Sequence, residues 1–135
     1  MIGANLKVSD LMSTQLIVAH IDDTMEFAEF DMKTANVRHV LVVGQNNRLA
    51  GVVSDRDVLR AFGARGDNSL ILGAIMSTNP ITIRDIEPAQ KALEVMLEHK
   101  ISCLPVEGDD GQLVGVVTET DFMQLLHHEM TVNSD

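Results

Sequence analysis

Apolar and polar positions along the chain predict a regular succession of strands and helices. Between residues 25 and 35 the apolar residues recur three or four positions apart, which is typical of an amphipathic helix, and Asp23 is expected to cap its start. The β-branched runs at residues 40–43 and 49–53 predict two strands joined by a turn rich in asparagine. A short extended run precedes this group, and a second helical pattern follows from Ser54. The predicted order is β-α-β-β-α.

The same order recurs in the second half of the chain. A shift of 64 residues aligns residues 11–62 with residues 75–126 without a gap and keeps the glycines and apolar runs in phase. One repeat is too small to be stable alone, so the two copies are expected to cover each other. The predicted fold is mixed α+β, with tandem repeats that form one pseudo-two-fold symmetric domain. We place the first repeat at residues 8–62, a linker at residues 63–71 and the second repeat at residues 72–128.

The amino-acid composition excludes several kinds of partner and binding site. The chain has 135 residues, with 20 acidic against 10 basic side chains and a formal charge of −10. It contains no Trp or Tyr and only four Phe, so nucleic acid and anionic membranes are unfavourable partners. A single cysteine excludes an internal disulfide and a thiolate zinc site. The apolar runs are too short to span a membrane and the N-terminus lacks the pattern of a secretion signal, so we expect a cytoplasmic protein.

The order of motifs within each repeat resembles a known family. Each copy has Met-Ser-Thr, an extended segment, an amphipathic helix, and then Gly-Val-Val followed by Ser-x-x-Asp57 or Thr-x-x-Asp121. This order resembles the cystathionine-β-synthase (CBS) domain, and the two copies resemble a CBS pair, also called a Bateman module. The resemblance implies a stand-alone regulatory sensor that binds AMP, ADP, ATP or S-adenosylmethionine in the clefts between the repeats. It would signal by conformational change to an effector protein that the sequence does not identify.

The resemblance also implies roles for individual residues. In the family the motif aspartate holds the ribose hydroxyls and the preceding Ser or Thr lies near the phosphates, while residues opening the second strand face phosphate. A carboxylate can accept from both ribose hydroxyls, and an arginine presents a forked set of donors to an oxyanion. The implied nucleotide-binding residues are Arg38, His39, Ser54, Arg56, Asp57, Thr118, Thr120 and Asp121. The implied adenine-pocket residues are Thr14, Ile17, Thr78 and Ile81.

Purely structural interpretations stand beside these roles. Ser54-x-x-Asp57 and Thr118-x-x-Asp121 have the spacing of helix capping boxes, which can coexist with ligand binding. Cys103 lies in an apolar strand and is expected to be a buried, inert thiol. CBS pairs commonly dimerise, and the second helix of each repeat carries an apolar excess that predicts a homodimer through helical faces. The residues of this excess are Val58, Leu59, Ala61, Phe62, Phe122, Met123, Leu125 and Leu126.

Catalysis is not expected, because no nucleophile–base–orienter set, glycine-rich phosphate loop or HExxH pattern is present. We therefore predict no catalytic residues, no metal ligands and no required cofactor. Two alternatives to a nucleotide sensor remain. The first is a Mg²⁺ sensor that uses acidic pairs such as Asp22-Asp23 or Asp109-Asp110. The second is a dimerisation module that binds no ligand.

Overall fold

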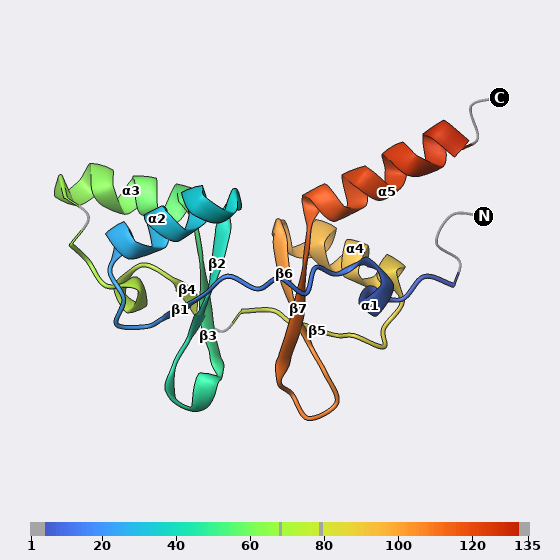
Figure 1. Ribbon diagram of the computed structural model, residues 1–135, viewed down its shortest axis with the longest axis horizontal. Helices are drawn as coiled ribbons and strands as arrows, with labels where there is room; N and C mark the ends of the chain where they lie inside the picture. Colours follow the sequence, from blue (N-terminus) through green and yellow to red (C-terminus); the bar gives the residue numbers. More distant parts are fainter. Residues whose placement is uncertain (1–4, 68, 79, 133–135) are drawn as a thin grey trace. The chain divides into compact units, whose positions relative to one another are not determined.

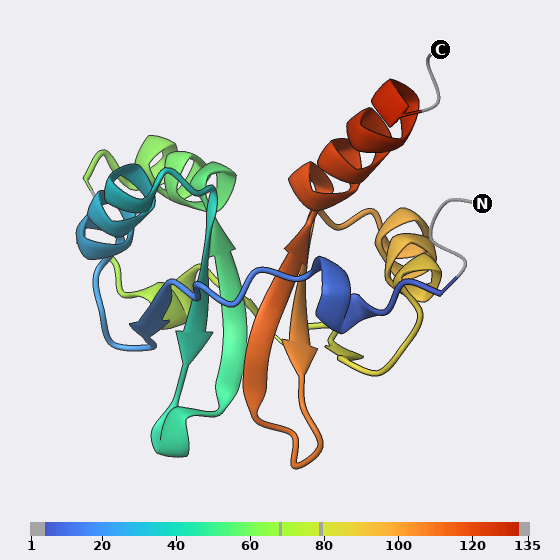
Figure 2. The same ribbon diagram turned by 45° about the vertical axis from the view of Figure 1, so that its right-hand side comes forward.

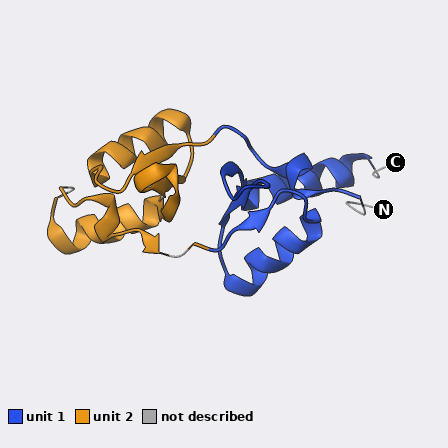
Figure 3. Ribbon diagram, turned by 90° about the horizontal axis from the view of Figure 1, so that it is seen from below, with its two compact units in different colours: residues 1–15, 81–135 blue, residues 16–80 orange. Residues whose placement is uncertain are grey.

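The computed structural model describes residues 5–67, 69–78 and 80–132 (Figure 1). The chain divides into two compact units, which we call unit 1 and unit 2 (Figure 3). Unit 2 is a continuous stretch, residues 16–80, whereas unit 1 combines residues 1–15 with residues 81–135. Both units mix helices with a small sheet, so the predicted α+β class is confirmed.

Unit 2 contains a four-stranded sheet in the order β1-β2-β3-β4. β1 runs parallel to β2, and the other two pairings are antiparallel. The hairpin turn between β2 and β3 lies at the opposite end of these strands from α3 (Figure 2). The elements of unit 2 are β1 (Val18–His20), α2 (Met25–Ala35), β2 (His39–Val43), η1 (Gln45–Asn47), β3 (Leu49–Ser54), α3 (Asp55–Arg65), η2 (Leu72–Ala74) and β4 (Ser77–Thr78).

Unit 1 repeats this plan with a three-stranded sheet in the order β5-β6-β7. β5 is parallel to β6, and β6 is antiparallel to β7. Both units therefore have the predicted β-α-β-β-α order. The elements of unit 1 are α1 (Val8–Leu11), β5 (Ile83–Arg84), α4 (Ala89–His99), β6 (Cys103–Glu107), β7 (Leu113–Thr118) and α5 (Glu119–Val132).

Each unit has its own hydrophobic core. In unit 2 the buried face of α2, with Met25 and Met32, packs with the valines of β2 and β3 and with Leu72. In unit 1 the buried residues Ala92 and Met96 of α4 pack with the strand residues and with Val8 of α1. Val8 and Leu72 each come from the segment that opens the other sequence repeat. Burying a side chain of this size contributes roughly 1.5–3 kcal/mol, so each core gains stability from that segment.

Each unit contains a segment that belongs to the other sequence repeat. Ser13, near the start of the first sequence repeat, exchanges backbone hydrogen bonds of 2.9 and 3.0 Å with Val116 of β7 in unit 1. In unit 2, β4 precedes the second copy of the extended segment and pairs with β3, placing Thr78 opposite Gly51. The structural units are therefore displaced by one segment from the repeats seen in the sequence.

The helix ends follow from local chemistry. α2 is capped by Thr24, whose hydroxyl accepts from the Phe27 amide at 3.3 Å. The prediction of Asp23 as the cap is wrong, because its carboxylate instead accepts from the His20 amide at 2.8 Å. α3 extends through Arg65 and therefore includes residues 63–65 of the predicted linker. Among the described residues, no helix combines the length and apolar character needed to cross a lipid bilayer.

Candidate functional site

The start of α3 in unit 2 brings together the motif residues of the first repeat. The Ser54 hydroxyl oxygen accepts from the Asp57 amide at 3.1 Å, and the Asp57 Oδ2 accepts from the Ser54 amide at 2.9 Å. This is the capping box that the spacing indicates. The second oxygen of Asp57, Oδ1, lies 3.7 Å from Arg60 Nη1, and the Asp57 side chain is 19% exposed. One carboxylate oxygen thus holds the helix start while the other faces a cation.

Arg38 and His39 lie beside this helix start. The Arg38 carbonyl oxygen accepts from the Asp55 amide at 3.0 Å, which joins the beginning of β2 to the beginning of α3. His39 is paired with Ser54 across the antiparallel ladder and is half-buried. Arg38 and Arg56 are exposed. Unit 2 therefore gathers all five nucleotide-binding candidates of the first repeat at one end of its sheet.

The four adenine-pocket candidates are divided between the two units, and each unit contains one candidate from each sequence repeat. Ile17 accepts a backbone hydrogen bond of 2.9 Å from Leu41 and belongs to unit 2, as does Thr78 in β4. Thr14 follows the segment paired with β7, and Ile81 packs against the core of unit 1. The exchange of segments therefore places Ile17 with Thr78 and Thr14 with Ile81.

In unit 1 the matching carboxylate is held by a threonine. Asp121 Oδ2 accepts from the Thr118 amide at 2.8 Å and from the Thr118 hydroxyl at 3.3 Å. Thr120 is exposed beside it. The Glu119 amide donates to the Ser102 carbonyl oxygen at 3.2 Å, matching the contact between Asp55 and Arg38 in unit 2.

Cys103 lies opposite Thr118 in the ladder of unit 1 and is 8% exposed. Burial raises the pKa of its thiol to about 12, and the nearby Asp121 charge adds to the effect. The thiol is therefore neutral at physiological pH, as expected for an inert buried cysteine. Arg60, by contrast, is a contact of Asp57 that the sequence interpretation did not include; its position one helical turn after the motif was the available signal.

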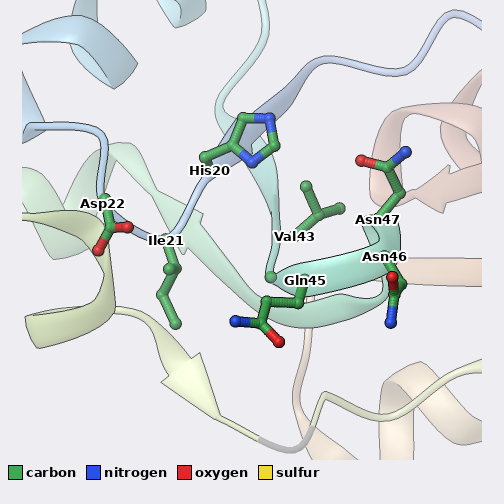
Figure 4. Close-up of a pocket in the computed structure, with 8 residues that line it drawn as sticks. His20, Ile21, Asp22, Val43, Gln45, Asn46 and Asn47 are labelled. Carbon is green, nitrogen blue, oxygen red and sulfur yellow. The ribbon is translucent and has the colours of Figure 1, made fainter.

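Two cavities lie in the described part of the chain, one in each unit. One, of about 300 Å³, opens between the end of β1 and the β2–β3 turn, where His20, Asp22 and Gln45 surround it (Figure 4). The other, of about 470 Å³, lies between α4 and α5 and has an apolar lining that includes Leu97 and Phe122. Neither lining contains a candidate nucleotide-binding residue. Within the described part of the chain, no three His, Cys, Asp or Glu side chains lie close enough to hold a metal ion together.

Comparison with protein families identifies the repeat. The CBS domain matches residues 8–64 and matches again at residues 72–128. The chain belongs to the CBS domain family. The resemblance of the duplicated motif to a CBS pair is thereby confirmed.

Curated relatives of this CBS pair differ in length. A CBS domain-containing protein of Dictyostelium discoideum is 29% identical over 130 residues, which is 88% of this chain and 90% of that protein. A homoserine O-acetyltransferase of Methanohalobium evestigatum is 31% identical over 88% of this chain, but the match covers only 24% of the enzyme. The shared part is thus a minor portion of that acetyltransferase.

Solved CBS pairs have the same fold. A putative acetoin utilization protein from Vibrio cholerae has a TM-score of 0.88 at 28% identity, covering 96% of this chain and 98% of that one. The CBS pair of protein MJ0100, in complex with 5′-methylthioadenosine and S-adenosylmethionine, has a TM-score of 0.82 at 27% identity, over 91% and 97%. CBSX2 in complex with AMP has a TM-score of 0.74 at 25% identity, over 93% and 97%.

Proposed function

We propose that this CBS pair is a regulatory protein that binds adenosine-containing ligands, with Asp57 and Asp121 as the ribose-binding residues. The observation that carries the proposal is the duplicated carboxylate at the third position of α3 and α5. In both units one oxygen of this carboxylate accepts from the residue that opens the helix. The other oxygen takes no part in this contact. In Asp57 it lies 3.7 Å from Arg60, an exposed and therefore weak pair, and ribose hydroxyls would donate to it in a complex.

The family supports the ligand class. Solved CBS pairs hold 5′-methylthioadenosine and S-adenosylmethionine in one case and AMP in another, so the shared group is adenosine. In this chain Ser54 and Thr118 would stand near the phosphate or thioether end, with Arg38, His39, Arg56 and Thr120 around them. Ile17 with Thr78, and Thr14 with Ile81, would contact the adenine. Binding would shift the population of conformations and so change how a partner is contacted.

A calorimetric titration tests the proposal. Adenosine, AMP, ATP and S-adenosylmethionine are titrated into the wild-type chain and into Asp57→Asn and Asp121→Asn, which keep the size of the side chain. Losing a charged acceptor should weaken binding at the affected unit by about tenfold. Asp55→Asn is the matched control, because Asp55 is an exposed acid beside the motif. Absence of binding by all four ligands, or equal affinities in all variants, would contradict the proposal.

We further propose that the chain forms a homodimer through its helical faces. Leu59 is 71% exposed, Met123 is 68% exposed and Leu126 is 56% exposed, so α3 and α5 present apolar side chains to the surroundings. Val58, by contrast, is 3% exposed and belongs to the core of unit 2, so it drops out of the predicted face. Light scattering coupled to gel filtration should give twice the monomer mass for the wild type. The double variant Leu59→Glu with Leu126→Glu should have the mass of a monomer. A monomeric wild type would contradict the proposal.

A further inference from the structure

The two units differ in charge at their matching motif ends. Four positions around the α3 start of unit 2 carry a guanidinium or an imidazole, and all four are neutral in unit 1. Both units keep their acidic residues, Asp55 and Asp57 in one and Glu119 and Asp121 in the other. The replaced pairs, related by the 64-residue shift, are Arg38 with Ser102, His39 with Cys103, Arg56 with Thr120, and Arg60 with Gln124.

The basic residues of unit 2 lie on the two segments that meet at the start of α3, the beginning of β2 and the first turns of the helix. Arg60 lies 3.7 Å from Asp57 Oδ1, the oxygen outside the capping box, and the Arg60 side chain is 79% exposed. Arg38 is tied to the same helix start through its carbonyl oxygen, and Arg56 lies in the first turn of α3. All three arginines are exposed and can meet an incoming ligand. An exposed ion pair as long as that between Arg60 and Asp57 is weak, so a better anion can take over the guanidinium.

The matching end of unit 1 offers neutral groups. Cys103 is buried, and its raised pKa keeps the thiol uncharged. The Thr118 hydroxyl is directed to Asp121, which leaves that carboxylate with a neutral partner. Lys100 is a cation that unit 2 lacks at the equivalent Asn36, and it lines the cavity between α4 and α5 together with Glu119. The motif end of unit 1 therefore has negative side chains without an arginine at the matching positions.

We infer that the two units select ligands of different charge: unit 2 takes a 5′-phosphorylated adenosine ligand, and unit 1 takes one without phosphate. This inference rests on the proposed adenosine binding, adds Arg60 to the residues that contact the ligand, and makes Arg56 and Arg60 the pair that recognises phosphate. A phosphate near the α3 start would accept from these guanidinium groups and relieve the Arg60 contact with Asp57. The same phosphate near α5 would meet Glu119 and Asp121 with no arginine at the matching positions, so a neutral or cationic adenosine ligand is favoured there.

Exchange of the discriminating side chains provides the test. Adenosine, which has no phosphate, and AMP are each titrated by calorimetry into the full chain at low and high NaCl. Arg56→Thr with Arg60→Gln gives α3 the residues of α5, and Thr120→Arg with Gln124→Arg does the reverse. All four positions are exposed, so folding should be preserved and is checked by circular dichroism. Arg65→Gln, in the last turn of α3, is the matched control for loss of an arginine.

The wild type should show one tight AMP site whose affinity falls with salt, because exposed charges are screened. Removing both arginines of α3 should weaken AMP about tenfold or more and change adenosine affinity less than threefold. Adding both arginines to α5 should create a second tight AMP site. Equal losses for AMP and adenosine, or two equal AMP sites in the wild type, would overturn the inference alone. Failure of both ligands to bind the wild type would instead refute the proposed function, and the inference with it.

Discussion

A side-chain carbon on Gly51 of β3 would lie 2.5 Å from the backbone carbonyl oxygen of Ser77 in β4. Real Cβ atoms do not approach that closely, so β4 can pair with β3 only because residue 51 is glycine. Gly51→Ala should push β4 away and lower the free energy of unfolding by about 1–3 kcal/mol. Urea unfolding followed by circular dichroism measures this loss as a lower midpoint.

Two other glycines provide the comparison for that substitution. Gly63 lies within α3, and a Cβ there would point into open space, so Gly63→Ala should stabilise the helix by roughly 0.5–1 kcal/mol. At Gly115 the nearest obstacle is the flexible Met12 side chain, with the Ser13 carbonyl oxygen at 3.1 Å. Gly115→Ala should therefore cost less than Gly51→Ala. The steric explanation is wrong if Gly51→Ala leaves the midpoint unchanged.

The ends of α2 and α4 make a second prediction. Asn36 and Lys100 occupy equivalent C-caps and share a left-handed backbone, with φ of 57° and 55°. Asparagine tolerates this conformation better than lysine does. Lys100→Asn should therefore raise the unfolding free energy by a few tenths of a kcal/mol to about 1 kcal/mol, and Asn36→Lys should lower it similarly. Thermal unfolding measures both changes.

The change in net charge of these two variants affects the unfolding free energy in the direction opposite to the backbone effect. In a chain of net charge −10, removing a lysine increases self-repulsion and adding one decreases it. If Lys100→Asn destabilises while Asn36→Lys stabilises, net charge outweighs the backbone effect and the prediction fails.

Much of the fold could be predicted because the same sequence pattern occurs in both halves of the chain. The apolar residues 40–43 of β2 form a continuous buried run, and β3 alternates buried with half-buried residues. The same two patterns recur in β6 and β7. Local signals also identified the capping box of Ser54 and Asp57 and the buried position of Cys103. These features depend on contacts within one repeat, where spacing along the chain determines which residues meet.

The features that were not predicted depend on which of several available partners a residue contacts. Nothing in the spacing of residues 12–14 indicates that Ser13 pairs with Val116. Thr24 caps α2 in place of Asp23 because the Asp23 carboxylate accepts from the amide of His20, three residues earlier, a local alternative that the spacing does not distinguish. Arg60 was missed because the motif itself stops at Asp57. Spacing along the chain therefore predicts which contacts are possible. It does not predict which of several competing partners a side chain contacts.

A hydrogen bond between Thr82 and Glu107 provides a third prediction. The Thr82 hydroxyl donates to Glu107 Oε1 at 2.6 Å, a short, partly buried contact beside β5 and β6. Thr82→Val removes the donor and should cost about 1–3 kcal/mol, since the half-buried carboxylate loses a partner. The equivalent positions in unit 2 are Val18 and Val43. The double variant Thr82→Val with Glu107→Val should therefore recover part of the loss.

A double-mutant cycle by urea unfolding measures the coupling between these two residues. Glu107→Val alone completes the cycle, and a coupling energy near zero would show that the short contact does not stabilise the unit. Arg84 and Asp109 serve as a control pair, because their ion pair of 3.5 Å is exposed. Its coupling should lie below about 1 kcal/mol.

Reactivity of Cys103 makes the fourth prediction. It is the only cysteine of the chain, so thiol labelling reports on this residue alone. Because its thiol is buried and neutral, labelling by a water-soluble disulfide reagent should be slow in the folded protein and fast in urea. Fast labelling of the folded protein at pH 7 would contradict the burial of this side chain.

The same thiol predicts a loss of stability at alkaline pH. Burial, with a smaller contribution from the Asp121 charge, raises the pKa of Cys103 from 9.0 to about 12 in the folded protein. Between these values the unfolded thiol releases its proton while the folded thiol keeps it, so ionisation favours the unfolded chain. The contribution is complete below pH 9 and is lost as the pH rises toward 12. Cys103→Ala cannot ionise there, so its unfolding free energy should fall less than that of the wild type over this range. Parallel urea titrations at pH 7, 9 and 10.5 measure the difference, and identical pH dependence in both proteins would mean that Cys103 ionises as readily folded as unfolded.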